Sequence, residues 1–137
     1  MPFDAARIAE TREWLTKAQI DLRAADHDRT AEPPITADMV FHAQQVVEKM
    51  LKAFLCWHDV PFRKTHNLVE LGERCADIEE IAEPLLRKAA VLTEYAWKFR
   101  YPGDAEEPEI AEADEAVALA RAVNQAVLNC LPDDLCP

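Results

Sequence analysis

The chain has 137 residues and a formal net charge of −11, and half of its residues are hydrophobic. This length and composition predict one globular domain with its own core and exclude a disordered chain. The negative charge disfavours non-specific attraction to nucleic acid and to anionic membranes, and only two glycines leave no glycine-rich phosphate loop.

Five helical segments follow one another, and no segment alternates with period two. The first helix is expected over 4–27 with Asp4 as its N-cap, and the second over 37–58 with Thr36 as its cap. Thr65 is expected to cap a short third helix over 66–76. A fourth helix follows over 84–99 and a fifth over 110–131, where Pro132 ends it. The sequence thus predicts an all-α fold, an up-and-down bundle of four to five antiparallel helices, with one domain over 1–137, a core over 5–131 and a tail over 132–137.

The second helix carries two stripes. Its apolar stripe steps by three and four residues and comprises Val40, Ala43, Val47, Met50 and Phe54. Its polar stripe falls at i, i+3, i+4 and i+7 and comprises Gln45, Glu48, Lys49 and Lys52. An amide, an acid and two lysines on one stripe favour a binding site or a partner surface. The alternative is that the two lysines are solvated charges.

Catalytic and metal-binding motifs are not found. Serine is absent, which excludes a Ser-His-Asp triad. Cys56 and His66 are a weak candidate for a nucleophile–base pair, because Cys56 lies between Leu55 and Trp57 and is expected to pack in the core. The histidines are scattered without an H-x-x-x-H pair, so we expect no metal and no cofactor. The four cysteines match no zinc or redox spacing. Without an apolar signal core or a membrane-length apolar run, we expect a cytoplasmic protein with reduced thiols and no membrane contact.

Two further segments contain candidate binding residues. His66 lies beside the start of the third helix with Arg63 and Lys64, where cations and a helix N-terminus together favour an anion. Arg100 and Tyr101 follow the end of the fourth helix. The alternatives are that Arg100 only complements the helix dipole and that Gln45 and His66 form hydrogen bonds within the bundle.

These residues carry a family resemblance. The segment 42–53 (HAQQVVEKMLKA), the sequel Thr65-His66-Asn67-Leu68 and the motif Arg100-Tyr101-Pro102-Gly103-Asp104 resemble the HEPN domain (higher eukaryotes and prokaryotes nucleotide-binding) over roughly residues 5–131. The resemblance implies a helical bundle that usually forms a homodimer. It also implies a small nucleotidyltransferase as partner, in a toxin–antitoxin-type pair.

Many HEPN proteins are metal-independent ribonucleases with an arginine followed by four to six residues and a histidine. No arginine of this chain has a histidine at that spacing. We therefore expect no catalytic residues and a nucleotide- or partner-binding protein. The expected binding residues are Gln45, Glu48, Lys49, Lys52, His66, Arg100 and Tyr101. The alternative is a toxin-like ribonuclease in which Arg100 works with a histidine from elsewhere, such as His66 supplied across a dimer.

A homodimer is also expected from the second helix, where Val46, Leu51, Leu55 and Trp57 add apolar surface beyond the apolar stripe. The alternative is that these four residues belong to a single core.

Overall fold

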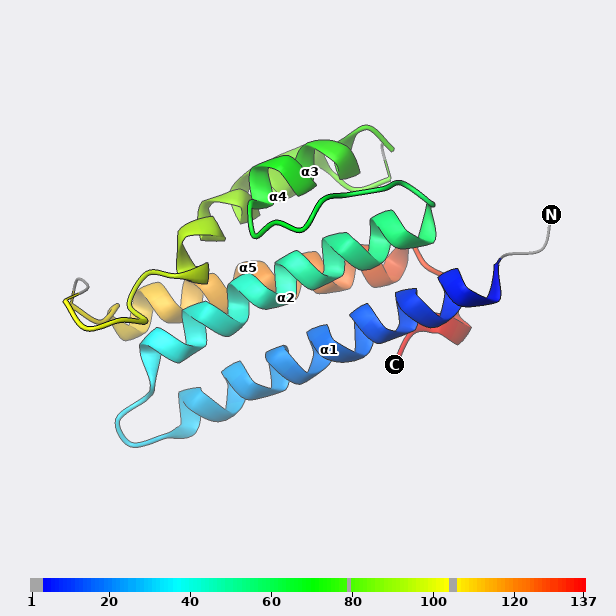
Figure 1. Cartoon of the computed structure of the whole chain (residues 1–137). Coiled ribbons are helices and arrows are strands. Elements are labelled where there is room, and N and C mark those ends of the chain that lie inside the picture. The colour runs from blue at the N-terminus through cyan, green and yellow to red at the C-terminus, as the bar shows by residue number, and fades with distance from the viewer. Residues whose placement is uncertain (1–3, 79, 104–105) are drawn as a thin grey trace.

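The computed structural model describes residues 4–78, 80–103 and 106–137, and every regular element within these ranges is helical (Figure 1). The elements are α1 (Ala5–Thr30), α2 (Thr36–Trp57), α3 (Leu68–Ala76), α4 (Glu83–Ala89), the 3₁₀ helix η1 (Ala90–Ala96), α5 (Ile110–Asn129) and the 3₁₀ turn η2 (Asp133–Leu135). The predicted all-helical bundle is confirmed. None of the helices in these ranges has the length and apolar character needed to cross a membrane. Asp104, which ends the motif that starts at Arg100, lies outside the described residues.

α2 is the central helix. It contacts α1, α5, α3 and η1, and Figure 1 shows α1 along one side of it and α3 and α4 along the other. The predicted apolar stripe of α2 is completely buried. Val46, Leu51 and Leu55 are buried as well, because neighbouring helices cover α2 on more than one face. They belong to the single core, so the expectation that they form a second surface is wrong; half-buried Trp57 packs against the same core.

The starts of the two long helices differ in how they are capped. Asp4 caps α1 as predicted, since its Oδ1 accepts the Ala6 N–H at 2.9 Å. Thr36 does not cap α2. It is the first helical residue and is buried, and Ile35 before it makes no side-chain cap.

The cap of α3 is also displaced from its predicted position. Asn67, and not Thr65, accepts the first-turn N–H groups of Val69 and Glu70, at 2.9 and 3.3 Å. Thr65 instead accepts the N–H of Asn67 at 3.0 Å. Asparagine caps a helix at least as well as threonine, so the helix begins two residues later than expected.

The predicted fourth helix is not continuous. α4 ends at Ala89 and the chain tightens into η1, which ends before Phe99. The Thr93 hydroxyl donates to the Ala90 carbonyl at 2.7 Å and accepts the Leu68 N–H at 3.1 Å. A threonine that bonds the preceding turn competes with regular helical bonding, and here it also satisfies a donor at the start of α3.

Candidate functional site

The central position of α2 forces most of its polar side chains to find partners inside the protein. Glu48 and Lys52 are only 3% and 5% exposed, and Gln44 is fully buried. Buried polar groups without partners cost several kcal/mol, so such residues occur in satisfied networks.

Glu48 is the centre of one network. Its Oε1 accepts from His66 Nδ1 at 2.7 Å and from Gln44 Nε2 at 3.1 Å, and its Oε2 accepts from Lys52 Nζ at 3.0 Å. Gln44 Nε2 also donates to the His66 carbonyl at 3.2 Å. The loop over 58–67 therefore runs back along α2, as Figure 1 shows, and these bonds fix its end.

Lys52 is enclosed rather than solvated. Its Nζ lies 5.2 Å from the centre of the Trp14 ring and 5.9 Å from that of Phe62, and the two rings meet edge to face. Aromatic faces stabilise a desolvated cation by about 1–2 kcal/mol. Lys49 is engaged too, because its Nζ bonds Asp21 Oδ2 at 2.5 Å. The alternative that both lysines are solvated charges is wrong.

His66 is the exposed member of the Glu48 network. Its side chain is 63% exposed, while Nδ1 is held by Glu48. Because a carboxylate only accepts, the proton between them sits on Nδ1 when the imidazole is neutral, which leaves Nε2 as an acceptor. Gln45 joins the network from the side, since its Nε2 donates to Gln44 Oε1 at 2.7 Å.

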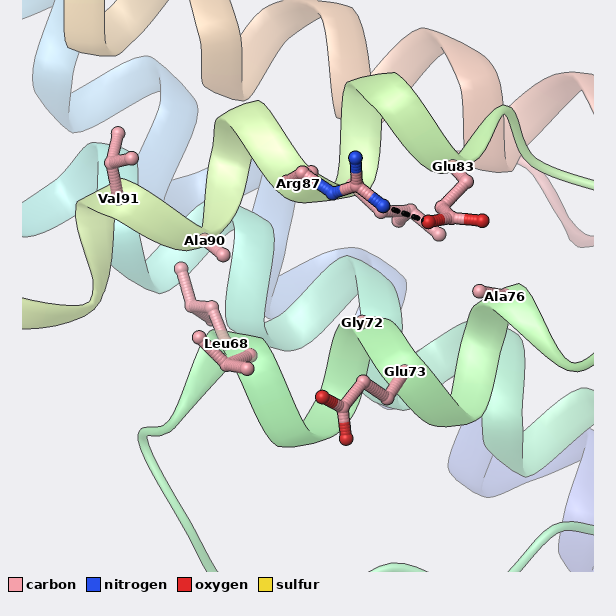
Figure 2. Close-up of a pocket in the computed structure, with 10 residues that line it drawn as sticks. Leu68, Gly72, Glu73, Ala76, Glu83, Arg87, Ala90 and Val91 are labelled. Carbon is pink, nitrogen blue, oxygen red and sulfur yellow. Dashed lines mark hydrogen bonds and ion pairs between the residues drawn. The ribbon is translucent and has the colours of Figure 1, made fainter.

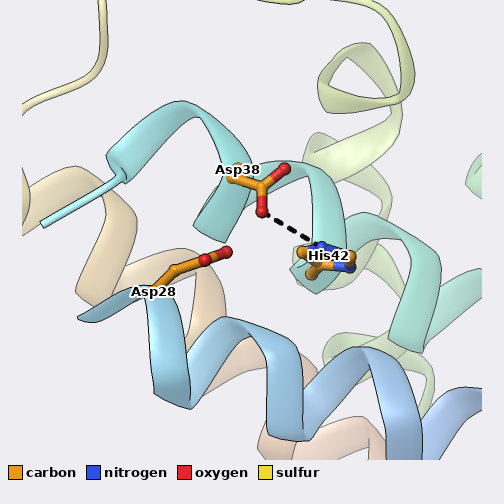
Figure 3. Close-up of side chains that lie close together, drawn as sticks. All are labelled: Asp28, Asp38 and His42. Atoms are coloured by element: carbon orange, nitrogen blue, oxygen red, sulfur yellow. Dashed lines mark ion pairs between the residues drawn. The ribbon is translucent and has the colours of Figure 1, made fainter. Parts of the chain in front are cut away.

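A second polar cluster joins α1 to the first half of α2. His42 Nδ1 bonds Asp21 Oδ1 at 2.7 Å, and His42 Nε2 lies 3.2 Å from Asp38 Oδ2. The buried Asp28 of α1 points into the same place, and ligand atoms of Asp28, Asp38 and His42 all lie within 4.8 Å of one another (Figure 3). No metal site was expected from the sequence, but these three residues form a group whose atoms could hold an ion.

The pKa values in this cluster diverge. Burial would raise the pKa of Asp21, but hydrogen bonds from His42 and Lys49 outweigh it and lower that pKa. The bond to Asp21 raises the pKa of His42. Burial, and then the adjacent Asp38 carboxyl, raises the pKa of Asp28 to about 7.

Arg100 lies at the start of α2. Its guanidinium stacks 3.6 Å from the centre of the Phe41 ring. It lines a pocket of about 270 Å³ with Phe99 and with Ile35, Ala37 and Asp38 from the first turn of α2. Tyr101, next along the chain, is exposed.

The predicted site residues thus lie in two places along α2, one near its start and one from its middle onward. Phe41, which holds Arg100, and Glu48, which holds His66, are seven residues apart, or about 10 Å along a helix. His42 shares the Phe41 contact with Arg100, since its ring lies 5.4 Å from the Phe41 ring. Sequence reasoning missed Asp21, Asp28 and His42. The available signal was that two acids of α1 share the register of its buried apolar residues.

A separate apolar groove lies between α3 and α4 with the start of η1 (Figure 2). Its volume is about 460 Å³, and Leu68, Gly72 and Leu86 form part of its wall. Val91 at one end is 67% exposed. The Glu83–Arg87 ion pair lies on the α4 side, and Glu73 on the α3 side, so both charge signs border the groove.

Comparison with known proteins identifies the family of the chain. The comparisons with curated proteins and with solved structures found no significant match. The family model described as "HEPN domain" matches residues 11–130, which include all of α2, α3 and α4, both polar clusters and Arg100. Since the match covers most of the 137 residues, the chain belongs to the HEPN domain family.

Proposed function

We propose that this HEPN protein binds a nucleotide in the pocket beside Arg100 and works with a small nucleotidyltransferase in a toxin–antitoxin-type pair. The main support is the seating of Arg100, whose guanidinium the Phe41 ring holds over the first turn of α2. The first N–H groups of a helix have no partner within it and carry partial positive charge. An arginine at that point completes a site for a phosphate group.

The surroundings of the pocket suit a nucleotide better than a long nucleic acid. Trp97 and Tyr101 do not line the pocket, but they are exposed on the same short segment as Arg100 and offer rings for a base. Asp38 also lines the pocket, and His42, 3.2 Å away, opposes its charge when the imidazole is protonated, a form that the raised pKa of His42 favours. A net charge of −11 would repel an extended phosphate backbone.

In this proposal the predicted binding residues divide into two roles. Arg100 and Tyr101 contact the ligand. Gln45, Glu48, Lys49, Lys52 and His66 hold α2 and its neighbouring segments in place, because their polar atoms engage other protein groups. The direct roles predicted for these five residues stay a prediction.

The test is equilibrium binding of ATP and GTP to the full chain, read also as thermal stabilisation. We expect Arg100→Ala to weaken binding by about tenfold or more, since it removes a charged hydrogen-bonding group. The control is Arg121→Ala, which removes an exposed arginine paired with Asp26 on α1. A melting temperature unchanged by ATP, GTP and a candidate nucleotidyltransferase would contradict the proposal.

A metal-independent ribonuclease is the second candidate. The observation in its favour is that Arg100 and His42 flank the same Phe41 ring. Both His42 nitrogens face aspartates, which hinders a role in moving substrate protons. RNA cleavage that survives EDTA and disappears in Arg100→Ala would favour this function; intact RNA after incubation with the purified protein would exclude it.

We also propose a homodimer formed by the groove of Figure 2. The exposed Val91 and the apolar wall suit a second copy, and a two-fold axis could set Arg87 of one copy against Glu73 of the other. Sedimentation should show a dimer that Val91→Glu dissociates. Ile20→Glu is the matched control, because Ile20 is an exposed residue of α1. A monomer of 15.5 kDa at micromolar concentration would contradict the dimer.

The proposed compartment is the cytoplasm. All four cysteines are free thiols, as suits a reducing environment. Labelling of Cys130 and Cys136, which are half-buried, in protein taken rapidly from cells would test this; thiols already oxidised there would contradict it.

A further inference from the structure

We propose that Asp28, Asp38 and His42 form a binding site for a divalent first-row transition metal such as Mn²⁺. The three side chains come from two helices and converge on one point (Figure 3). They offer two carboxylate oxygens and one imidazole nitrogen, a donor set that suits Mn²⁺, Fe²⁺ or Zn²⁺.

The first argument is an unsatisfied buried oxygen. Asp28 is 9% exposed, and among the described residues its Oδ2 has no hydrogen-bond partner. Figure 3 shows the Asp28 carboxylate directed from α1 toward Asp38 and His42 on α2. A buried carboxylate oxygen without a donor is costly, and a cation at this point would remove that cost.

The second argument is the orientation of His42. Its Nδ1 bonds Asp21 Oδ1 at 2.7 Å, so the neutral imidazole carries its proton on Nδ1. In that neutral form Nε2 directs a lone pair at Asp38 Oδ2, 3.2 Å away, so the two acceptors need a proton or a cation between them. Metal-bound histidines usually have this arrangement, in which a carboxylate holds the other ring nitrogen and fixes the tautomer.

The third argument is the charge balance. Three carboxylates, those of Asp21, Asp28 and Asp38, gather around one lysine, Lys49, and one imidazole. Arg29, next to Asp28 in the chain, is directed elsewhere and bonds Asp114. When all three carboxylates are ionised, the cluster therefore has more negative than positive charge in a partly buried place, so either a proton on Asp28 or a bound cation balances it.

The geometry needs only side-chain adjustment. With metal–ligand bonds of about 2.1 Å, neighbouring ligand atoms lie about 3 Å apart around an octahedral ion such as Mn²⁺ and about 3.4 Å apart around a tetrahedral one. Here the three atoms lie within 4.8 Å of one another. In the proposed site, rotation of the two aspartate side chains closes this difference, and water completes the coordination.

The test is a titration of the full chain with Mn²⁺ alone. Binding is measured as the loss of the free-ion signal in electron paramagnetic resonance. Mn²⁺ is chosen because it prefers oxygen ligands and so avoids the four thiols. We expect one saturable site, weakened about tenfold or more in Asp28→Asn and Asp38→Asn. Asp21→Asn, which leaves all three ligands, should weaken binding by a smaller factor.

The matched control is Asp26→Asn. Asp26 is an exposed acid of α1 that pairs with Arg121, and its variant should bind Mn²⁺ like the wild type. Circular dichroism of each variant establishes that the helices remain. Absence of saturable binding by the wild type would overturn the proposal, because a proton would then suffice to satisfy the cluster. Equal affinity of Asp28→Asn and wild type would overturn it as well.

Discussion

The two polar clusters on α2 solve the burial of charge in opposite ways. Around Glu48, both carboxylate oxygens have donors, and the Lys52 ammonium lies between two aromatic rings. Around Asp28, an oxygen lacks a donor among the described residues and carboxylates outnumber cations. The comparison suggests that the first cluster stabilises the fold and that the second, beside the Arg100 pocket, is poised for a ligand.

The largest expected effect is on the Glu48 network. Glu48→Ala leaves the Lys52 ammonium buried without its carboxylate, and we expect a loss of about 3–5 kcal/mol in the free energy of unfolding. Urea denaturation measures it. Glu94→Ala, which breaks the exposed pair with Lys98, should cost about 0.5 kcal/mol or less.

A double variant sharpens this prediction. Glu48→Leu with Lys52→Met replaces both charges by apolar groups and should recover much of the loss, because it removes the unpaired charge. If Glu48→Ala lowers the free energy of unfolding no more than Glu94→Ala does, the Glu48 network does not stabilise the fold as a buried element, and the contrast between the two clusters is wrong.

The second effect is a pH dependence centred on Asp28. Because its pKa is raised from 3.8 to about 7, the folded protein keeps a proton that the unfolded chain has released. Its contribution to stability is full below pH 3.8 and is lost as the pH rises through about 7, with a slope of at most about 1.4 kcal/mol per pH unit.

The measurement must separate Asp28 from its neighbours. Asp38 and His42 face Asp28 from α2. The raised pKa of His42 also makes the stability fall as the pH rises, whereas the lowered pKa of Asp21 makes the stability fall as the pH is lowered. The difference between wild type and Asp28→Asn in EDTA isolates Asp28. A difference that does not change between pH 4 and pH 8 would contradict the assignment.

The smallest effect is expected at His66. His66→Ala removes an exposed imidazole and one of the donors to Glu48, so we expect a loss of about 1 kcal/mol. Hydrogen exchange should increase over residues 58–67, since this bond helps to hold that loop. Unchanged exchange there would show that the Gln44 bond to the His66 carbonyl is sufficient.

The sequence predicted what depends on local pattern. The buried stripe of α2 from Val40 to Phe54 and the Asp4 cap follow from helical periodicity and local hydrogen bonding. The polar stripe was recognised too, but not that Glu48 and Lys52 are buried. Burial of that face depends on Trp14 and Phe62, which reach it from α1 and from the loop after α2.

What could not be predicted depends on long-range pairing. Asp28 and His42 meet only because α1 and α2 pack antiparallel, in a register that no local pattern specifies. Thr65 and Asn67 are both good capping residues, so their order could not be decided from propensity alone. The 3₁₀ segment after Ala89 contains Thr93, which accepts a hydrogen bond from Leu68, a residue 25 positions away that no local pattern links to it.

Nucleotide binding beside Arg100 is tested most directly by a nitrogen–proton correlation spectrum of the labelled chain during titration with ATP or GTP. We expect the amide shifts to concentrate in residues 35–42 and 97–103, around the Arg100 pocket, while Glu48, Lys52 and His66 change little. Shifts centred on Lys52 and His66, or no shifts at saturating nucleotide, would contradict it.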